Sequence, residues 1–487
     1  MEFQIKLFVV HLLFLTINSV DLINGQRRSF CCQEYCYDSD KEKTQINYFS
    51  SKTSYFIEKR KQPGKEFFVP NCTPEKIWFY VRHGARLPKN KEIKRLRKLE
   101  KVRDKIIKNY EKHNTLPKYG EMCDSDLNLL KKWKWDSNIT KEYDEHLTVQ
   151  GWNEVKKIAL RFKGLFPDIF KTPYDKEKYL FRYTDADRSE STFQAYVDGL
   201  FGSDFDPKSI EVPPGEENNN LIMPYFLCPT DKEETRGNRS EYRKYLESKI
   251  MYRLVSDVSE RLGFKTPLEP EVVFDMYDMC IYDQAWNPEK TSAWCSAFTP
   301  SQIYHLEYPE DLRKYYESGH GRVGNSRLLC SLMNDMLTHL ESKTEPKAIV
   351  YLTHSSSFLL LLSTLGAYKD AAPLKADNYY SMSNRKWRLS NIAPLASNLA
   401  TVKYNCPNEI EQEKVMFFLN EEPIEFDWCN MGLCDWKDVK ENYKIYTQVN
   451  CDEYYCYSGA SATAIITKVL IAGVSMSFII KYAFFHS

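Results

Sequence analysis

Residues 77–88 read Ile-Trp-Phe-Tyr-Val-Arg-His-Gly-Ala-Arg-Leu-Pro and decide how the rest of this chain is interpreted. The first five residues form an unbroken apolar run, which is typical of a strand buried on both faces of a parallel sheet. The next seven contain two arginines, a histidine, a glycine and a proline, a combination that is difficult to explain without a function. This stretch therefore predicts a buried strand that delivers Arg82, His83 and Arg86 to a site.

Two later stretches repeat the arrangement of a largely apolar run followed by a basic or imidazole side chain. Residues 179–183 lead into Thr-Asp-Ala-Asp-Arg-Ser, which contains Arg188, and residues 348–353 end at His354. Each run is followed by a helical pattern, and this alternation of strand and helix predicts an α/β fold. Because ligands of open α/β sheets bind beyond the carboxyl ends of the strands, we expect the three groups to converge there.

The side chains at these strand ends match the chemistry of a phosphoryl group. A guanidinium presents a planar fork of donors that fits phosphate oxygens. Taken singly, His354 is more simply explained as a loop histidine, and Arg188 as a surface residue paired with a nearby aspartate. The phosphate pocket that we expect therefore depends on their meeting with residues 82–86.

The motif Arg-His-Gly-x-Arg-x-Pro at residues 82–88 resembles that of the histidine acid phosphatases. Within that group the chain is most similar to the multiple inositol-polyphosphate phosphatases, over nearly all of residues 26–456. The similar segments include Cys-Cys-Gln-Glu-Tyr-Cys from Cys31, Thr-Asp-Ala-Asp-Arg-Ser ending at Ser189, and Ala-Ser-Asn-Leu from Ala396. The wider superfamily, which includes phosphoglycerate mutases, shares the Arg-His-Gly motif. The resemblance implies an α/β core with a mixed, mostly parallel sheet flanked by helices, and an α-helical lid domain.

The resemblance also implies a role for each cationic residue. His83 is the nucleophile, which forms a phosphohistidine intermediate, and His354 is the second catalytic histidine. Together with Arg82, Arg86 and Arg188, His354 holds the phosphoryl oxygens. The implied activity is removal of phosphate from polyanionic inositol polyphosphates, such as inositol hexakisphosphate, without a metal ion or a cofactor. The nucleophile must be neutral, and the ordinary histidine pKa of about 6.5 makes that form accessible.

One residue type that the resemblance implies is missing after His354. The family places Asp one residue after this histidine, or Glu two residues after it, to protonate the leaving alkoxide. Here residues 355–357 are all serine, and loss of general acid catalysis typically costs about 10²–10⁴-fold in rate. Three explanations stay open: another acid reaches in from the helical insertion, a neighbouring phosphate of the substrate donates the proton, or the protein turns over slowly and mainly binds.

A strongly basic segment follows the motif. Residues 89–108 contain ten Lys or Arg and three Asp or Glu. The apolar residues Ile93, Leu96, Val102 and Ile106 recur at roughly helical spacing, so we expect one amphipathic helix. Its basic face is either simply solvated or steers a polyanionic substrate towards the pocket.

The composition is that of an ordinary globular chain. The 487 residues include 67 Lys and Arg and 67 Asp and Glu, and this zero formal net charge argues against a general nucleic-acid-binding protein. The 14 cysteines favour an oxidising compartment and disulfide bonds, with Cys429/Cys434 and Cys451/Cys456 as candidate local bridges. Zinc binding is the alternative, but the chain has no Cys-x-x-Cys pair.

Both ends of the chain indicate the secretory pathway. The short apolar run after Lys6 is typical of a signal peptide, which we place at residues 1–22. Small residues from Ser458, a spacer and an apolar tail resemble a GPI-anchor signal over residues 459–487, which is removed. A transmembrane anchor is the alternative, but 12 uncharged residues are short for it. We therefore expect a lipid-anchored protein on the extracellular face of the cell membrane, with glycosylation sequons at Asn71, Asn138 and Asn238.

The mature region, residues 26–456, is expected to form one histidine phosphatase domain. We place its α/β core at about 45–200 and 341–450, and a helical insertion that covers the site at about 201–340. A helix is predicted over about 149–163, with Thr148 as its N-cap. Two late strands are predicted, at about 399–404 and 414–419.

Other functions remain compatible with the sequence. A general acid phosphatase shares the cationic pocket. A surface protein that binds phosphorylated ligands without turnover fits the three serines at 355–357. Phosphoglycerate mutase activity shares the first motif, but a signal peptide and 14 cysteines do not suit a cytosolic enzyme.

Overall fold

The computed structural model describes residues 34–55, 68–113, 116–118, 120–170, 173–226, 239–344, 346–429 and 431–456. The expected signal peptide and anchor signal lie outside these ranges, as do Asn238, Cys31, Cys32 and Cys228. Within the ranges, no helix has both the length and the apolar character needed to cross a bilayer.

Seven strands form one mixed sheet in the order β2-β3-β1-β4-β5-β6, with β7 also paired to β5. Their bounds are β1 (Thr73–Arg82), β2 (Tyr179–Tyr183), β3 (Ala348–Thr353), β4 (Asn398–Asn405), β5 (Glu413–Leu419), β6 (Glu422–Pro423) and β7 (Leu433–Asp435). All five strands predicted from the sequence are present. The sheet is mixed as expected, but its parallel pairs are confined to β2, β3 and β1, and pairing from β4 onward is antiparallel. A short connection such as that between β4 and β5 joins antiparallel neighbours, because a parallel pair needs a long crossover.

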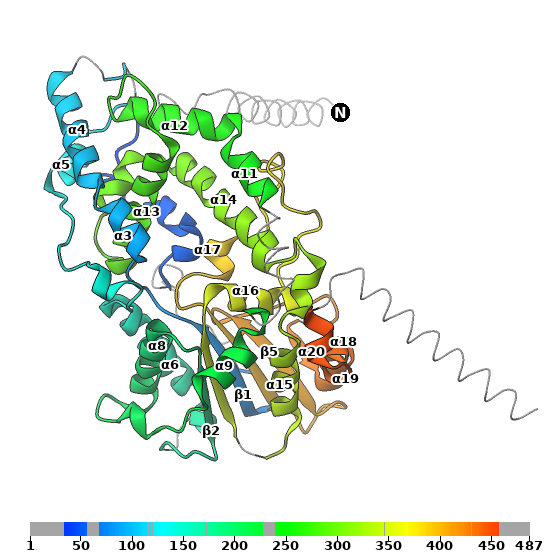
Figure 1. Cartoon of the computed structure of the whole chain (residues 1–487). Coiled ribbons are helices and arrows are strands. Elements are labelled where there is room, and N and C mark those ends of the chain that lie inside the picture. The colour runs from blue at the N-terminus through cyan, green and yellow to red at the C-terminus, as the bar shows by residue number, and fades with distance from the viewer. Residues whose placement is uncertain are drawn as a thin grey trace, which may run out of the picture.

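Helices cover both faces of the sheet (Figure 1). On β1, alternate side chains such as Phe79 pack with one group of helices, α6 (Val149–Leu165), α7 (Pro167–Phe170) and α8 (Asp187–Phe201). The intervening side chains, such as Trp78 and Tyr80, pack with α15 (Cys330–Glu341), α16 (Ser355–Thr364) and α18 (Trp436–Tyr443) on the other face. This two-residue alternation accounts for the burial of β1 from Lys76 onward and of all of β3.

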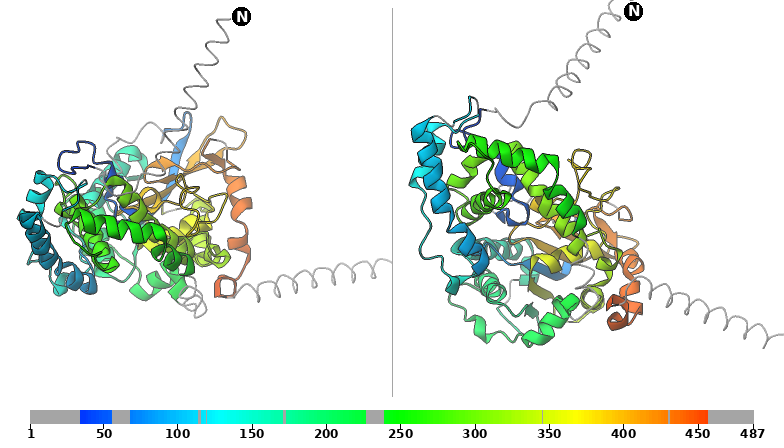
Figure 2. Two further views of the ribbon diagram at one scale, coloured as in Figure 1. Left: turned by 90° about the horizontal axis from the view of Figure 1, so that it is seen from above. Right: turned by 45° about the horizontal axis from the view of Figure 1, so that its top comes forward.

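A helical region lies beyond the carboxyl ends of the parallel strands, in the upper half of Figure 1. It includes α11 (Ser240–Leu246), α12 (Lys249–Arg261), α13 (Pro270–Trp286) and α14 (Pro300–Ser318), all from the expected insertion at 201–340. It also includes α3 (Asn90–Leu96), α4 (Leu99–Lys112) and α5 (Asp124–Lys132), from a segment that the sequence assigned to the core. In Figures 1 and 2, the blue-to-cyan α4 and α5 form one flank of this region.

The remaining helices are short. They are α9 (Gly215–Ile222), α17 (Leu389–Ile392), α19 (Ile445–Gln448) and α20 (Cys451–Cys456), and the 3₁₀ helices η1 (Thr44–Tyr48), η2 (Ser50–Lys52), η4 (Lys141–Tyr143), η5 (Pro207–Ser209), η6 (Pro224–Phe226), η7 (Ala293–Ala297) and η8 (Val323–Arg327).

The basic segment at 89–108 does not form the single helix that its periodicity predicted. It forms α3 and α4, with a break at Arg97 and Lys98. The two pieces have different partners, since α3 packs against α13 and α4 packs against α5. Buried Leu96 and Leu99 lie on either side of the break. A bend lets each piece bury its own apolar residues, and tertiary packing overrides the local pattern.

Five disulfides join cysteines of the described residues. Cys429–Cys434 confirms one of the two predicted local bridges, and the other is wrong because Cys451 is bonded to Cys330. The two helices that carry Cys330 and Cys451, α15 and α20, pack together, a contact that the sequence could not reveal. The other bonds are Cys36–Cys123, Cys72–Cys406 and Cys280–Cys295.

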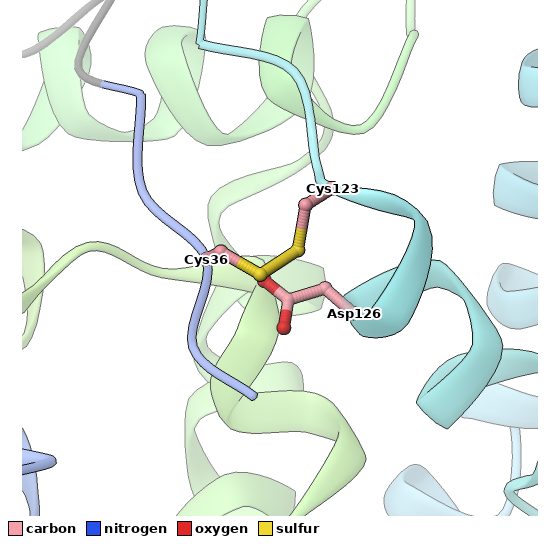
Figure 3. Close-up of side chains that lie close together, drawn as sticks. All are labelled: Cys36, Cys123 and Asp126. Carbon is pink, nitrogen blue, oxygen red and sulfur yellow. A yellow bond between two sulfur atoms is a disulfide. The ribbon is translucent and has the colours of Figure 1, made fainter. Parts of the chain in front are cut away.

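Figure 3 shows one of these bonds beside a carboxylate, Asp126. The sulfur atoms of Cys36 and Cys123 are bonded to each other, so neither is a thiolate that could bind a metal ion. The Asp126 carboxylate accepts hydrogen bonds from the backbone N–H groups of Tyr37 (2.9 Å) and Asp38 (2.8 Å). This cluster therefore fixes the N-terminal segment to α5.

The start of α6 supports the loop that carries the Arg-His-Gly motif. Thr148, the predicted N-cap, accepts a hydrogen bond from the Gly151 N–H (3.1 Å) and donates one to the Ala85 carbonyl (3.0 Å). A Cβ atom added at Gly84 would overlap the Gly151 backbone, and one added at Gly151 would overlap Ala85. The glycine of the motif is therefore required for close approach of the loop to α6.

This contact predicts opposite effects for two glycine substitutions in the same helix. Gly151→Ala should destabilise the protein by about 1–3 kcal/mol, because the loop and the helix must move apart. Gly164→Ala is the matched control, since its Cβ meets nothing within 4 Å, and it should stabilise α6 by about 0.5–1 kcal/mol. Urea denaturation measures both changes, and equal effects of the two substitutions would contradict the close approach.

Candidate active site

The cationic residues predicted from three separate strand ends lie together at one edge of the sheet. The register of β1 and β3 ends with Arg82 opposite Thr353, so that His83 and His354 follow at the same level. The His83 N–H extends this ladder by donating to the Thr353 carbonyl at 3.0 Å. The two imidazole rings are 5.8 Å apart between centroids. The parallel pairing therefore brings together residues that are far apart in the sequence.

These side chains line a cavity of about 870 Å³ between the sheet edge and the helical region. All five predicted residues (Arg82, His83, Arg86, Arg188 and His354) contribute to its lining. The basic segment and the serine run contribute Lys89 and Ser356, and elements that the sequence did not assign to the site contribute Lys52, Glu145, Glu310 and Lys314.

His83 is held as a neutral imidazole. Its Nδ1 lies 3.0 Å from the Gly84 carbonyl oxygen, which is an acceptor, so Nδ1 carries the proton and Nε2 carries the lone pair. Burial, followed by the charges of Arg82 and Arg86, holds the pKa of His83 well below its ordinary value. The structure therefore presents a buried, unprotonated Nε2 among cations, which is the form that a nucleophile requires.

His354 is also neutral. Its Nδ1 accepts a hydrogen bond from Arg188 Nε at 3.2 Å, which places its proton on Nε2, 2.9 Å from Thr184 Oγ1. Burial and the charge of Arg188 lower the pKa of His354 to about 3. In this structure His354 orients Arg188, and the contact with a phosphoryl oxygen expected from the sequence stays a prediction.

Arg82 is buried without a carboxylate partner among the described residues. Its Nη1 donates to the carbonyls of Ser51 (2.6 Å), Ala393 (2.7 Å) and Pro394 (3.0 Å), while its Nε has no partner in the described part of the chain. Burial and the neighbouring Arg86 lower the pKa of Arg82 to about 9. A positive charge held in this way is stabilised by an anion in the cavity.

Glu145 supplies a negative charge among the other cations of the cavity. Its carboxylate lies 3.4 Å from Arg188, 3.6 Å from Lys89 and 3.9 Å from Arg86. The residue precedes α6 and adopts a left-handed backbone with φ 60°. No sequence signal distinguished Glu145 from the other acidic residues of its segment.

Lys314 occupies the side of the cavity formed by α14 and α16. Its Nζ donates a hydrogen bond to Ser356 Oγ at 2.9 Å. Glu310, one turn earlier on α14, accepts a hydrogen bond from Ser51 and pairs with Arg313 at 3.1 Å. Although burial raises the pKa of Glu310, the charges of Arg313, Lys52 and Lys314 lower it to about 2. This side of the cavity therefore contains an ammonium group and an ionised carboxylate.

The basic segment contributes to the cavity only in part. Lys89 and Arg95 line the cavity, whereas Lys91 and Lys94 are exposed and do not. Arg95 is paired with Asp278 at 3.1 Å and with Asp275. Lys89, which is exposed and also lines the cavity, is therefore the member of this segment best placed to attract a substrate.

The sequons at Asn71 and Asn138 are exposed, so the surface leaves room for a glycan at both. Their glycosylation stays a prediction.

Comparison with known proteins gives a consistent set of relatives. The family model for the histidine phosphatase superfamily (branch 2) matches residues 79–420. Multiple inositol polyphosphate phosphatase 1 of Drosophila melanogaster is 41% identical over 429 residues, which cover 88% of this chain and 91% of that protein. The human protein of the same name is 27% identical over 439 residues, covering 82% of this chain and 87% of its own length. The crystal structure of the phytase from D. castellii superposes with a TM-score of 0.67 at 19% identity, covering 88% of this chain and 92% of that one, and confirms the fold.

The contact between Arg188 and His354 predicts how this histidine titrates. Arg188→Gln should raise the pKa of His354 by about one unit from its value of about 3, because a neighbouring positive charge is removed. His305 is the control, since burial alone lowers its pKa to about 4 and the substitution should not change it. NMR titration of ¹⁵N-histidine-labelled protein measures both, and a His354 that titrates near pH 6.5 in the unsubstituted protein would contradict this geometry.

Proposed function

This chain belongs to branch 2 of the histidine phosphatase superfamily and is a phosphoric monoester hydrolase, and we propose that it removes phosphate from inositol polyphosphates through a phosphohistidine intermediate. The observation that carries the proposal is the neutral His83 with Nε2 unprotonated among three arginines in one cavity. The name of the Drosophila relative, which is similar over most of both chains, supports the substrate class.

In the proposed reaction, His83 Nε2 attacks phosphorus and the bond from phosphorus to the ester oxygen breaks. Arg82, Arg86 and Arg188 stabilise the negative charge on the phosphoryl oxygens, and preorganised donors of this kind usually supply the largest share of catalysis. Water then attacks the phosphohistidine and releases phosphate. The ester oxygen leaves as an alkoxide unless a proton reaches it, so the reaction also needs a proton donor.

The size and charge of the cavity favour a multiply phosphorylated substrate. A volume of about 870 Å³ exceeds what one phosphate needs, and the lining of the cavity also includes Lys52, Lys89 and Lys314. While His83 attacks one phosphate, these ammonium groups are placed to bind others. A simple phosphate monoester has no further phosphate for them to bind.

A phospho-ligand-binding protein without turnover is the second candidate function. Its specific support is the run of three serines at 355–357, where the resemblance implies a carboxylic acid. Tight binding of inositol hexakisphosphate without phosphate release would favour this candidate over the hydrolase.

We also propose that the protein acts on the extracellular face of the cell membrane, bound by a C-terminal GPI anchor. The five disulfides of the described residues support an oxidising compartment. Release of the protein from intact cells by a phosphatidylinositol-specific phospholipase tests the anchor.

The hydrolase proposal predicts a dependence on His83. The purified protein should release phosphate from inositol hexakisphosphate, and His83→Ala should abolish this release because no other lone pair occupies the same position. His113→Asn is a control, since His113 is exposed and its left-handed backbone suits asparagine. Rapid quenching with ³²P-labelled substrate should trap an acid-labile phosphoprotein in the unsubstituted chain and in His113→Asn, but not in His83→Ala. A wild-type rate equal to that of His83→Ala would refute hydrolysis.

The position of Lys89 predicts a salt-dependent effect on substrate affinity. Lys89→Glu should raise the KM for inositol hexakisphosphate several-fold at low salt, and the effect should shrink as salt rises through about 0.1 M. Lys91→Glu is the matched control, because Lys91 is also exposed but does not line the cavity. If both reversals raise KM equally, the attraction is a property of the whole basic segment and not of the cavity entrance.

A further inference from the structure

We propose that Lys314 is the source of the proton that the leaving oxygen requires, and that the hydroxyl of Ser356 passes it on. This inference rests on the proposed hydrolase function and adds the donor that its mechanism lacks. It corresponds to one of the alternatives that the sequence left open, a donor from the helical insertion, but the donor on α14 is a lysine and not a carboxylic acid.

The geometry places the two side chains in series at the cavity. Lys314 Nζ donates to Ser356 Oγ at 2.9 Å, and both residues line the cavity that contains His83. Ser356 lies in the first turn of α16, two residues after His354, which is where the family resemblance implies the acid. Since Ser356 Oγ accepts from the ammonium, its own hydroxyl proton is free to point to a substrate oxygen.

The charges around Lys314 explain why it can give up a proton. Its side chain is largely buried, and the groups that face it are Arg313, Glu310 and Glu317 on α14, Arg82 on β1, and the uncharged hydroxyl of Ser356 on α16. Burial and the charge of Arg313 lower the pKa of Lys314 to about 8, in spite of Glu317 at 3.6 Å. The group is therefore charged at neutral pH but holds its proton more weakly than an ordinary lysine, whose pKa is about 10.4.

The nearby acids and imidazoles of the described residues are less suitable donors. The pKa of Glu310 is about 2, so this carboxyl has no proton at neutral pH. Glu145 lies among three cations, and Glu317 is paired with Arg239 and Arg313. His354 is neutral, and both of its ring nitrogens are engaged.

The proton transfers balance over the two steps. In the first step, the Nε2 lone pair of His83 forms a bond to phosphorus and the ester P–O bond breaks. The ester oxygen takes the hydroxyl proton of Ser356. Ser356 in turn takes a proton from Lys314, whose ammonium group becomes an amine. In the second, water attacks phosphorus and the P–N bond breaks, returning its electron pair to His83. The proton from water passes through Ser356 to the amine, which restores the ammonium.

If Lys314 donates a proton, the effect of replacing it on kcat depends on the leaving group of the substrate. A lysine that only binds substrate or stabilises the fold would not show this dependence. Inositol hexakisphosphate has a poor alkoxide leaving group, whereas the p-nitrophenolate of p-nitrophenyl phosphate leaves without a proton. Lys314→Met should lower kcat on the inositol substrate by about 10²-fold or more and on the nitrophenyl substrate by much less. Lys314→Arg should show the same selective loss with a smaller change in KM, because arginine keeps the charge but does not release its proton.

The pH profile gives an independent readout. With inositol hexakisphosphate, kcat/KM of the unsubstituted protein should fall as pH rises through about 8, because the donor must be protonated. This alkaline limb should be absent from the residual activity of Lys314→Met. Adding Ser356→Glu to Lys314→Met should restore turnover. The fall of kcat/KM with rising pH should then occur at a lower pH, because a carboxylic acid donates the proton.

Lys52→Met is the matched control. Lys52 lines the same cavity, but its pKa is raised by Asp278 at 3.1 Å, so it binds and does not donate. It should raise KM and show no selectivity for the leaving group. The inference is overturned if an active protein with Lys314→Met keeps its kcat on the inositol substrate, or loses kcat equally on both substrates. A wild-type protein that hydrolyses neither substrate overturns the proposed function as well.

Discussion

The parallel pairing of β1 with β3 is the constraint on which the site depends. Its register sets Arg82 opposite Thr353, and one further residue on each strand places the two histidines side by side. A slip of one residue would turn every side chain of a strand to the opposite face and separate the imidazoles. The alternating packing of buried aromatic side chains on both faces of β1 prevents such a slip, so the hydrophobic core fixes the catalytic geometry.

The main physical difficulty of this site is the concentration of positive charge at a buried sheet edge. The protein reduces it in three ways: three backbone carbonyls bind Arg82, Glu145 lies among three other cations, and both histidines remain neutral. Neutral imidazoles avoid further repulsion and leave His83 Nε2 as a nucleophile. The arrangement that limits repulsion among these cations is therefore also the one that prepares the site for a dianionic phosphoryl group.

The parts of this structure that could be predicted are those for which a short stretch of sequence carries a recognisable pattern. The bounds of β2 and β3 matched their largely apolar runs, although β2 contains Arg182 and only β3 is buried along its whole length. The convergence of their ends followed from the general topology of α/β sheets. Lys314 and Glu310 had no such signal, because α14 is a long helix of mixed polarity and only its packing against α16 turns these residues to the cavity. The partner of Cys451 and the break between α3 and α4 depend on tertiary contacts in the same way.

A lysine in place of a carboxylic acid changes the relation between binding and catalysis. A carboxylate repels the other phosphates of a polyanionic substrate, whereas the Lys314 ammonium attracts them. The same attraction stabilises the charged form, so a bound polyanion raises the pKa of Lys314 and weakens it as a donor. Arg313 and Arg82 act against this effect, because their charges lower that pKa. Tight binding and fast proton transfer therefore oppose each other at Lys314, and as phosphates are removed from the ring the balance shifts towards transfer.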